Sequence, residues 1–538
     1  MLCVSFINIK RALAAGIVAA FVVCSWPAAT ALAAPPSDYK IPKRAEKALR
    51  EGEFEVAEKI LRDLLAKDPQ NHSVRLGLSF ALLKQRRLQD AYDHAARVLL
   101  ADPLSARAHA LLGQAVLASG NFRESIEEFR TAISLNQDEA LAIAGLAMVD
   151  FYENRLNNCV RGLRRAISID SNEPDYVFNL GQAAARGEMY KEAADAYEKF
   201  LTIAHKTDAD RLARIRGLID FLRYLGKQSA LYLPAGKDAT VVSFEAADNR
   251  PILKIRVNGS KEPMQFVLDT GSGMSVISEE TANKLGMRPI ARGGMARAVG
   301  GGGKFEIVYG FLNSMDIGEV RVENVPVYIR HFYDDKVAVA GYLGLSVISR
   351  FFTAVDYGDQ TFKLVRQRAS ENMDQLNTPG DADSIATGVV EIPVRTTSSG
   401  FLSGEVRLEG IERPQNFIID TGATVSVVSE KLAALEELAN FKTAARLRIF
   451  GAAGVTDDVK TILLPSVMLG TTMRQQINAA VLDLESLNET SGFIQDGILG
   501  GNFLRHFRVS FDFRRGVIRL EPLSRTARSG ESLTPPKM

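Results

Sequence analysis

The hexapeptides Phe266-Val267-Leu268-Asp269-Thr270-Gly271 and Phe417-Ile418-Ile419-Asp420-Thr421-Gly422 lie 151 residues apart in this chain. In each, an apolar triplet led by Phe precedes Asp-Thr-Gly. Three common residues meet by chance in roughly one chain of this length in ten, so one copy would mean little. Two copies in matching surroundings indicate a duplicated unit. Two carboxyl groups that meet at a twofold interface can share one proton and activate a water.

The similarity extends beyond the hexapeptides. Residues 254–271 align with residues 405–422 without a gap, and each copy continues in short β-branched runs separated by Gly and Pro. We therefore predict two related β lobes at 238–366 and 389–524. Residues 367–388, rich in Ser, Asn, Asp, Thr, Pro and Gly, are expected to be a flexible linker between them.

A second pair of motifs closes each copy. Leu343-Gly344 and Leu499-Gly500 follow the two aspartates at similar distances. An aromatic residue and then an aspartate, Asp356 or Asp512, come at the same spacing after each glycine. We interpret these two aspartates as structural turn residues before a last strand, rather than as additional carboxylates of a site.

Both pairs of motifs resemble those of the pepsin-like and retropepsin-like aspartic proteases, and most of all the bacterial branch with retroviral-type lobes. Both lobes keep both elements of that family, although Tyr342 departs from the aliphatic pattern. The resemblance covers roughly residues 240–523 and implies a bilobal all-β fold in which Asp269 and Asp420 are catalytic. The supporting residues that it implies are Thr270, Gly271, Ser272, Thr421, Gly422, Leu343, Gly344, Leu499 and Gly500.

Peptide hydrolysis suits such a pair. A carboxylate can take a proton from water while its neutral partner donates one, and two ionised carboxylates in contact would repel. The resemblance implies that the Thr270 and Thr421 hydroxyls hydrogen-bond across the interface and fix the carboxyl spacing. It also implies pairing of the two lobes within one chain, with pairing between two chains left open.

The two loops differ at one position. Ser272 follows the first triplet and Ala423 follows the second. A hydroxyl that donates to a carboxylate stabilises its charged form, so we expect Asp269 to be the more readily ionised aspartate. The alternative is that Ser272 only packs.

Glycine runs lie where the family covers its cleft with β-hairpin flaps. Gly300, Gly301, Gly302 and Gly303 are the candidates in the first lobe, after Gly293-Gly294, and Gly451 and Gly454 are the candidates in the second. One flap per lobe would be the retroviral arrangement. The alternative is that these are ordinary surface loops.

In residues 43–226 the sequence pattern is different: apolar residues follow the spacing of a helix, and the pattern repeats every 34 residues. Small residues recur at Ala57, Ala91, Ser125, Cys159 and Ala193. The pattern resembles tetratricopeptide repeats, with about five units and a capping helix near residues 208–225. It implies an all-α solenoid whose groove holds a peptide or partner protein. A rigid spacer or a self-association surface is the alternative, and Cys159 is expected to be a packing residue.

The first 34 residues are predicted to be a secretory signal peptide, because Lys10 and Arg11 precede an apolar stretch and Ala31-Leu32-Ala33 offers small residues for cleavage. Uncleaved anchoring is the alternative. No later segment is expected to span a membrane, and residues 525–538 are expected to be disordered. We expect a periplasmic or secreted protein.

Composition narrows the function. Lys plus Arg (65) balance Asp plus Glu (64), which argues against nucleic acid as a partner. The six His residues are scattered, so neither a metal nor a cofactor is expected. We thus expect an exported aspartic endopeptidase acting on a peptide or protein substrate that its helical repeats recruit. The alternative is a non-catalytic peptide-binding scaffold.

Overall fold

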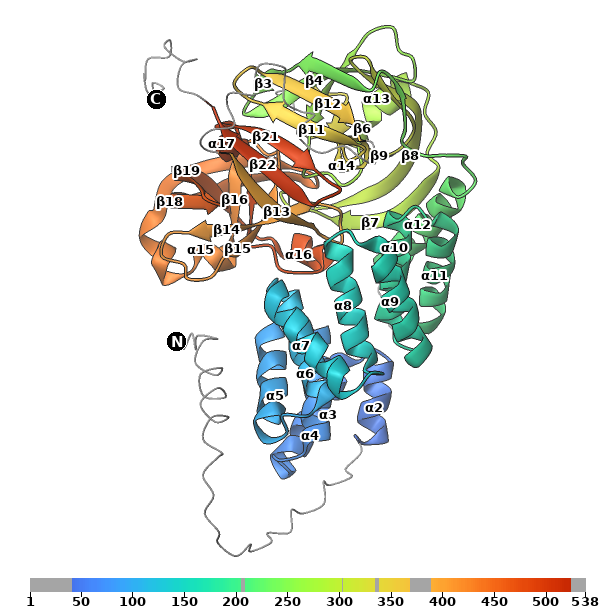
Figure 1. The fold of residues 1–538 in the computed structure, drawn as a ribbon, viewed down its shortest axis with the longest axis vertical. Coiled ribbons are helices and arrows are strands. Elements are labelled where there is room, and N and C mark those ends of the chain that lie inside the picture. The colour runs from blue at the N-terminus through green and yellow to red at the C-terminus, as the bar shows by residue number, and fades with distance from the viewer. Residues whose placement is uncertain (1–40, 205–208, 302, 334–337, 368–388, 524–538) are drawn as a thin grey trace, which may run out of the picture. The chain divides into compact units, whose positions relative to one another are not determined.

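The computed structural model describes residues 41–204, 209–301, 303–333, 338–367 and 389–523 (Figure 1). The predicted signal peptide and tail, and all but the first residue of the predicted linker, lie outside the described residues, as does the flap candidate Gly302. Within the described part of the chain, no helix has the length and apolar character needed to cross a membrane.

Helical hairpins form the first part of the chain, and a single longer helix follows them (Figure 1). The helices are α2 (Lys43–Arg50), α3 (Phe54–Lys67), α4 (His72–Lys84), α5 (Leu88–Ala101), α6 (Ala106–Ala118), α7 (Phe122–Leu135), α8 (Ala140–Tyr152), α9 (Leu156–Ile169), α10 (Pro174–Arg186), α11 (Tyr190–Ile203) and α12 (Ala209–Leu225). The expected all-α solenoid followed by β-rich lobes is confirmed.

The small residues of the 34-residue period lie where the paired helices touch. All five of them, Cys159 included, are fully buried. Burial raises the pKa of the Cys159 thiol to about 12, which fits its expected role in packing. Gly113 of α6 also makes room for a ring, since a Cβ there would lie 2.7 Å from Phe129.

The turn inside each hairpin needs one residue with positive φ, and it recurs every 34 residues. Gly52 and Gly120 supply it in two repeats, with φ of 74° and 88°. Arg86, Asn154 and Glu188 take the same conformation at φ of 60°, 58° and 61°. Since only glycine adopts this region freely, the sequence marks the turn in two of the five repeats.

On the inner side of the repeats, charged side chains connect helix α4 with the start of helix α10. Lys84 at the end of α4 donates to Glu173 at 2.7 Å and to Asp175 at 2.5 Å, both at the start of α10. The two carboxylates raise the pKa of Lys84 against the opposing effect of burial. A partner in the predicted groove would have to lie beside this bridge.

The first lobe is built on a nine-stranded sheet with the order β1-β9-β6-β10-β5-β4-β8-β7, in which β3 pairs with β4. Its strands are β1 (Leu233–Gly236), β3 (Glu245–Ala247), β4 (Arg250–Val257), β5 (Met264–Leu268), β6 (Val276–Ser278), β7 (Ala291–Arg297), β8 (Lys304–Ile317), β9 (Val320–Arg330) and β10 (Gly341–Leu343). Helices α13 (Glu279–Lys284) and α14 (Leu345–Ile348) follow β6 and β10.

The second lobe repeats this plan. Its strands are β13 (Val390–Thr396), β14 (Leu402–Leu408), β15 (Gln415–Ile419), β16 (Ser426–Ser429), β17 (Lys442–Gly451), β18 (Gly454–Leu469), β19 (Thr472–Leu482), β20 (Gly497–Leu499), β21 (Phe507–Asp512) and β22 (Val517–Pro522). Its helices are α15 (Glu430–Ala433), η3 (Glu436–Phe441), α16 (Glu485–Ser491) and α17 (Gly501–Leu504).

A shared sheet joins the lobes. Strands β2 (Ala239–Ser243), β11 (Phe351–Asp356) and β12 (Thr361–Arg366) come from the first lobe but extend the sheet of the second through β11 and β21. The first lobe also begins before the predicted residue 238, because Leu233–Gly236 already pairs with β9. That stretch follows closely on the repeats and carries no strong strand pattern, so no motif marked it as a strand.

The repeats and the second lobe share a hydrophobic core. Phe493, which is 1% exposed, contacts Phe122 and Tyr152 edge-on, with ring centroids 4.9 and 5.1 Å apart. The amide of Ile494 donates to the carbonyl of Ala118 at 2.9 Å. The repeats are therefore part of one folded body with the lobes.

Replacing Phe493 with Ala should lower the free energy of unfolding by about 3 kcal/mol, because a buried ring is lost from the shared core. Urea denaturation followed by far-ultraviolet circular dichroism would measure the shift. The matched control is Leu104→Ala, which removes a side chain that is 73% exposed and should change little. Equal midpoints for the two variants would contradict this account of the interface.

Candidate active site

Each aspartate of the duplicated motif lies at the end of a strand held by a second strand. Strand β5 runs parallel to β10, and the amide of Asp269 donates to the carbonyl of Leu343 at 3.0 Å. In the second lobe β15 runs parallel to β20, and Asp420 donates to Leu499 at the same distance. The Leu-Gly motifs thus lie directly beside the Asp-Thr-Gly loops.

Glycine is needed in those Leu-Gly motifs. A Cβ on Gly344 would lie 2.7 Å from the carbonyl oxygen of Ser272, and one on Gly500 would lie 2.7 Å from the backbone of Val425. Real Cβ atoms do not approach this closely, so a side chain at either position would push the neighbouring loop away.

The two Thr hydroxyls bind the loops together across the interface of the lobes. Thr270 Oγ1 donates to the carbonyl of Ile419 at 2.8 Å and accepts from the amide of Thr421 at 3.0 Å. Thr421 Oγ1 makes the equivalent bonds, to Leu268 at 2.7 Å and from Thr270 at 3.1 Å. Both Thr side chains are fully buried. The bonds expected from the sequence are present, and the lobes that make them belong to one chain.

The two carboxyl groups face one another. They are hydrogen-bonded to each other, and a Cβ on Gly271 would overlap the carboxyl group of Asp420. A Cβ on Gly422 would overlap that of Asp269 in the same way. Both glycines are therefore required by the approach of the opposite aspartate.

The surroundings of the carboxyl groups differ. Burial raises the pKa of Asp269, but hydrogen bonds from Ser272, Asp420 and the Gly271 amide and the charge of Arg250 limit the rise. Burial and the charge of Asp269 raise the pKa of Asp420 well above its ordinary value. The pKa of Asp420 is thus raised further than that of Asp269, so Asp269 is the more readily ionised of the two.

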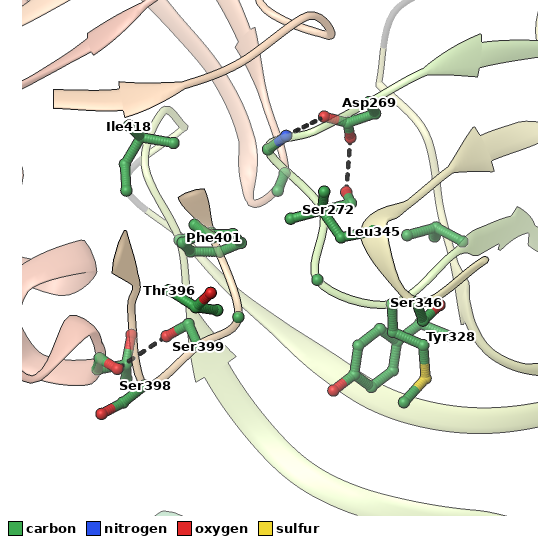
Figure 2. A pocket seen from close by; sticks show the side chains of 18 of the residues that line it. Asp269, Ser272, Tyr328, Leu345, Ser346, Thr396, Ser398, Ser399, Phe401 and Ile418 are labelled. Carbon is green, nitrogen blue, oxygen red and sulfur yellow. Dashed lines mark hydrogen bonds between the residues drawn. The ribbon is translucent and has the colours of Figure 1, made fainter. Parts of the chain in front are cut away.

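Ser272 is the side chain that makes this difference. Its hydroxyl donates to Asp269 Oδ2 at 2.5 Å, while the Gly271 amide donates to Oδ1 at 2.8 Å (Figure 2). On the other loop Asp420 Oδ1 accepts from the amides of Gly422 and Ala423, at 2.7 and 3.2 Å, with no hydroxyl at the equivalent position. The geometry agrees with the interpretation of Ser272 as a donor.

Asp356 and Asp512 do not join the pair. Asp356 Oδ1 accepts from the amides of Gly358 and Asp359, and Asp512 Oδ1 accepts from those of Arg514 and Arg515. Both side chains stabilise a turn before the last strand of their lobe, as the sequence suggested.

The two carboxyl groups line a cavity of about 1380 Å³. Figure 2 shows part of its wall, where Ser398, Ser399 and Phe401 of the second lobe lie opposite Tyr328 and Ser346 of the first. A space of this size accommodates several residues of an extended peptide. Among the described residues, no group of three or more His, Cys, Asp or Glu is placed to hold a metal ion.

Two hairpins, one from each lobe, meet beside this cavity. The tip of β7–β8 contains Gly300 and Gly301, and the tip of β17–β18 contains Gly451 and Gly454. A Cβ on Gly300 would lie 3.0 Å from Gly451, and the Gly301 amide donates to Thr456 Oγ1 at 2.6 Å. The flap candidates of the two lobes are thus in contact. Gly303 lies against Ala453, whereas Gly293-Gly294 forms a bulge within β7 and is not part of the tip.

The sequence did not reveal that α12, the helix that follows the repeats, packs on the first flap. Helix α12 lies against β7, and a Cβ on Gly217 would overlap the carbonyl of Arg292 (Figure 1). Arg214 donates to the carbonyl of Met295 at 2.6 Å. Tyr309 of β8 stacks on Phe221 of α12 with centroids 4.3 Å apart. A lone glycine in a helix gave no signal for this contact.

Two further cations near the site also lacked a sequence signal. Arg250 is 8% exposed, and its charge lowers the pKa of Asp269. Arg330 lies over the ring of Phe305 at 3.8 Å and donates to the carbonyl of Ala452 in the second flap. It thereby connects the first lobe to the flap of the second.

Solved structures with related folds have low identity to this chain. They include the aspartic proteinase of Irpex lacteus (14% identity, 54% of this chain and 100% of that chain, TM-score 0.37). A thermophilic TPR protein of Thermus thermophilus (17% identity, 33% and 95%, TM-score 0.29) and MamA (23% identity, 29% and 92%, TM-score 0.22) resemble the helical part. Comparison with the curated proteins finds no match.

Family models match both halves of the chain. An aspartyl protease model matches residues 253–347, and a gag-polyprotein aspartyl protease model matches residues 405–506. Tetratricopeptide-repeat models match residues 48–115 and 106–139. The chain is therefore a fusion of tetratricopeptide repeats with two aspartyl protease domains.

Proposed function

We propose that this protein is an exported aspartic endopeptidase that cleaves peptide bonds with a water held between Asp269 and Asp420. The observation that supports this most directly is the pair of carboxyl groups, hydrogen-bonded to each other and unequal in pKa, on the wall of a large cavity. An ionised and a neutral carboxyl in contact are what the reaction needs, since one must accept a proton while the other donates.

The roles follow from the difference in pKa. Ionised Asp269 takes a proton from the water as its oxygen attacks the peptide carbonyl carbon, and neutral Asp420 donates a proton to the carbonyl oxygen. As the carbon–nitrogen bond breaks, Asp269 passes its proton to the leaving nitrogen. Asp420 recovers one from a hydroxyl of the tetrahedral intermediate. The starting protonation is restored, and neither residue forms a covalent bond.

In this proposal the flaps and the repeats both help to bind and orient the substrate. Flaps in contact over the site exclude water and can hydrogen-bond an extended peptide. The repeats contribute side chains to the cavity wall, among them Tyr152, Arg186 and Tyr197. We therefore propose that the repeats orient the substrate at the cleft itself, besides any protein that they bind elsewhere.

The Asp269→Asn and Asp420→Asn variants should each lose cleavage of a peptide library by about 10²–10⁴-fold, because each removes one partner of the proton transfer. Asp356→Asn is the matched control, since an amide oxygen can still accept the turn hydrogen bonds. Mass spectrometry of the products would measure the loss. Undiminished cleavage by both dyad variants would contradict the mechanism, and peptide binding without cleavage by the unmodified protein would favour a non-catalytic clamp.

The Ser272→Ala variant should move the acidic limb of the pH–rate profile to higher pH by about one unit. The hydroxyl stabilises ionised Asp269, so its loss raises the pKa of the carboxyl that must be ionised for activity. Ser399→Ala is the control: Ser399 lines the same cavity but donates to the carbonyl of Thr490. An acidic limb that stays in place in Ser272→Ala would show that Ser272 only packs.

Export is proposed from the amino terminus, where the predicted signal peptide occupies residues 1–34. Expressed with its own amino terminus in a Gram-negative host, the protein should appear in the periplasm or medium with a mature end near Ala34–Pro35. Intact-mass measurement of the fractions would establish this. Recovery of the uncleaved chain from the membrane fraction would instead indicate an anchor.

A further inference from the structure

One wall of the catalytic cavity belongs to the repeats, and its acidic side chains are already paired. Glu153 pairs with Arg155, Glu188 with Arg350 of the first lobe, and Asp210 with Lys304 of the first flap. Each carboxylate that the described repeats contribute to this wall is thus paired with a cation other than Arg186.

Two arginines, Arg214 and Arg186, line the same wall, and they differ in whether a carboxylate lies close to them. Arg214 lies close enough to Asp210 to lower the pKa of that carboxyl. Arg186, the last residue of α10, forms no ion pair with an Asp or Glu of the described residues. Its guanidinium donates instead to three carbonyl oxygens, those of Phe151 (3.3 Å), Thr397 (2.5 Å) and Ser398 (3.2 Å).

The guanidinium of Arg186 is held in place and poorly solvated. It lies over the ring of Phe151, 3.7 Å from the centroid, and burial lowers the pKa of Arg186 to about 10. Carbonyl dipoles balance a full charge only in part, and these three bonds use three of the five N–H donors of the guanidinium. A cation in this setting is stabilised by an anion that enters the cavity.

This position is close to the reacting groups. The turn that accepts from Arg186 continues through Ser399, whose carbonyl lies against Gly273, where a Cβ would come within 2.6 Å of it. Gly273 directly follows Ser272, the residue that donates to Asp269. Ser398 and Ser399 lie in the wall shown in Figure 2. A peptide bound at the two aspartates thus brings a group only a few residues from the scissile bond to Arg186.

We propose that Arg186 is a specificity-determining residue that receives an acidic group of the substrate, so that the peptidase favours peptides with a carboxylate on the repeat side of the scissile bond. The carboxylate is either a Glu or Asp side chain or the free carboxyl terminus. This inference rests on the proposed peptidase function and assigns to the repeats a direct part in substrate selection.

The test compares Arg186→Gln and Arg186→Lys with the unmodified protein on three matched peptide sets. One set carries internal Glu and an amidated end, one has Gln and a free carboxyl end, and one has Gln and an amidated end. The unmodified protein should cleave one acidic set about tenfold to a hundredfold faster than the neutral set. Faster cleavage of the first set would identify a side-chain carboxylate as the recognised group, and faster cleavage of the second would identify the free carboxyl terminus.

In Arg186→Gln this ratio should fall to about one, because the favoured acidic set loses more cleavage than the neutral set, and Arg186→Lys should keep part of the preference. Arg164→Gln, which removes an exposed arginine paired with Glu192, should keep all of it. Equal cleavage of all sets by the unmodified protein would overturn the proposal. So would an equal loss on all sets in Arg186→Gln, which would show a purely structural contact.

Fluorescence-polarisation binding of the same peptides to Asp420→Asn separates this inference from the catalytic one. A preference for acidic peptides that depends on Arg186 would stand even if the unmodified protein cleaved none of them. Loss of the preference in binding, with cleavage intact, would overturn the role of Arg186 alone.

Discussion

The four buried hydrogen bonds between the Thr270 and Thr421 loops are the contact on which the site depends. Each hydroxyl is bonded to the backbone of the opposite lobe, so neither loop can move without breaking bonds in a region from which water is excluded. These bonds keep two acidic groups in contact although burial and mutual repulsion oppose it. The raised pKa of Asp420 beside Asp269 is a consequence of burial and of that imposed closeness.

The duplicated motifs indicated which two loops meet, because closely similar loops occupy equivalent places in the two lobes and bond to each other through Thr270 and Thr421. The period of small residues predicted the packing of the helical hairpins for a similar reason, since each repeat meets the same neighbour in the same way. The sequence did not reveal the contacts that occur at only one place in the structure. Phe493 in the repeat core, Gly217 against the first flap and the strand at Leu233–Gly236 each belong to no repeated pattern. Arg186 gave no signal either, because its neighbours Thr397 and Ser398 are distant in sequence.

Those single contacts change how the helical part is understood. A tethered binding module would leave the protease domains complete without it. Here the repeats share a core with the second lobe through Phe493, pack on the first flap through α12 and supply part of the cavity wall. The first two kinds of contact stabilise the fold, and the last places repeat side chains within reach of a bound peptide. The proposed selection and the proposed cleavage of the substrate therefore share one surface.

The two flap hairpins beside the cavity differ in what packs against them. Strand β17 has no buried residue, whereas in β7 Gly293 is buried next to the helix that follows the repeats. Lifting the first hairpin would require the helix to separate from β7, whereas the second hairpin is held by its contacts with the first flap and with Arg330. The first hairpin is therefore the more firmly held rim of the cavity. Any ligand that shifted α12 would alter the shape of that rim without touching the carboxyl groups.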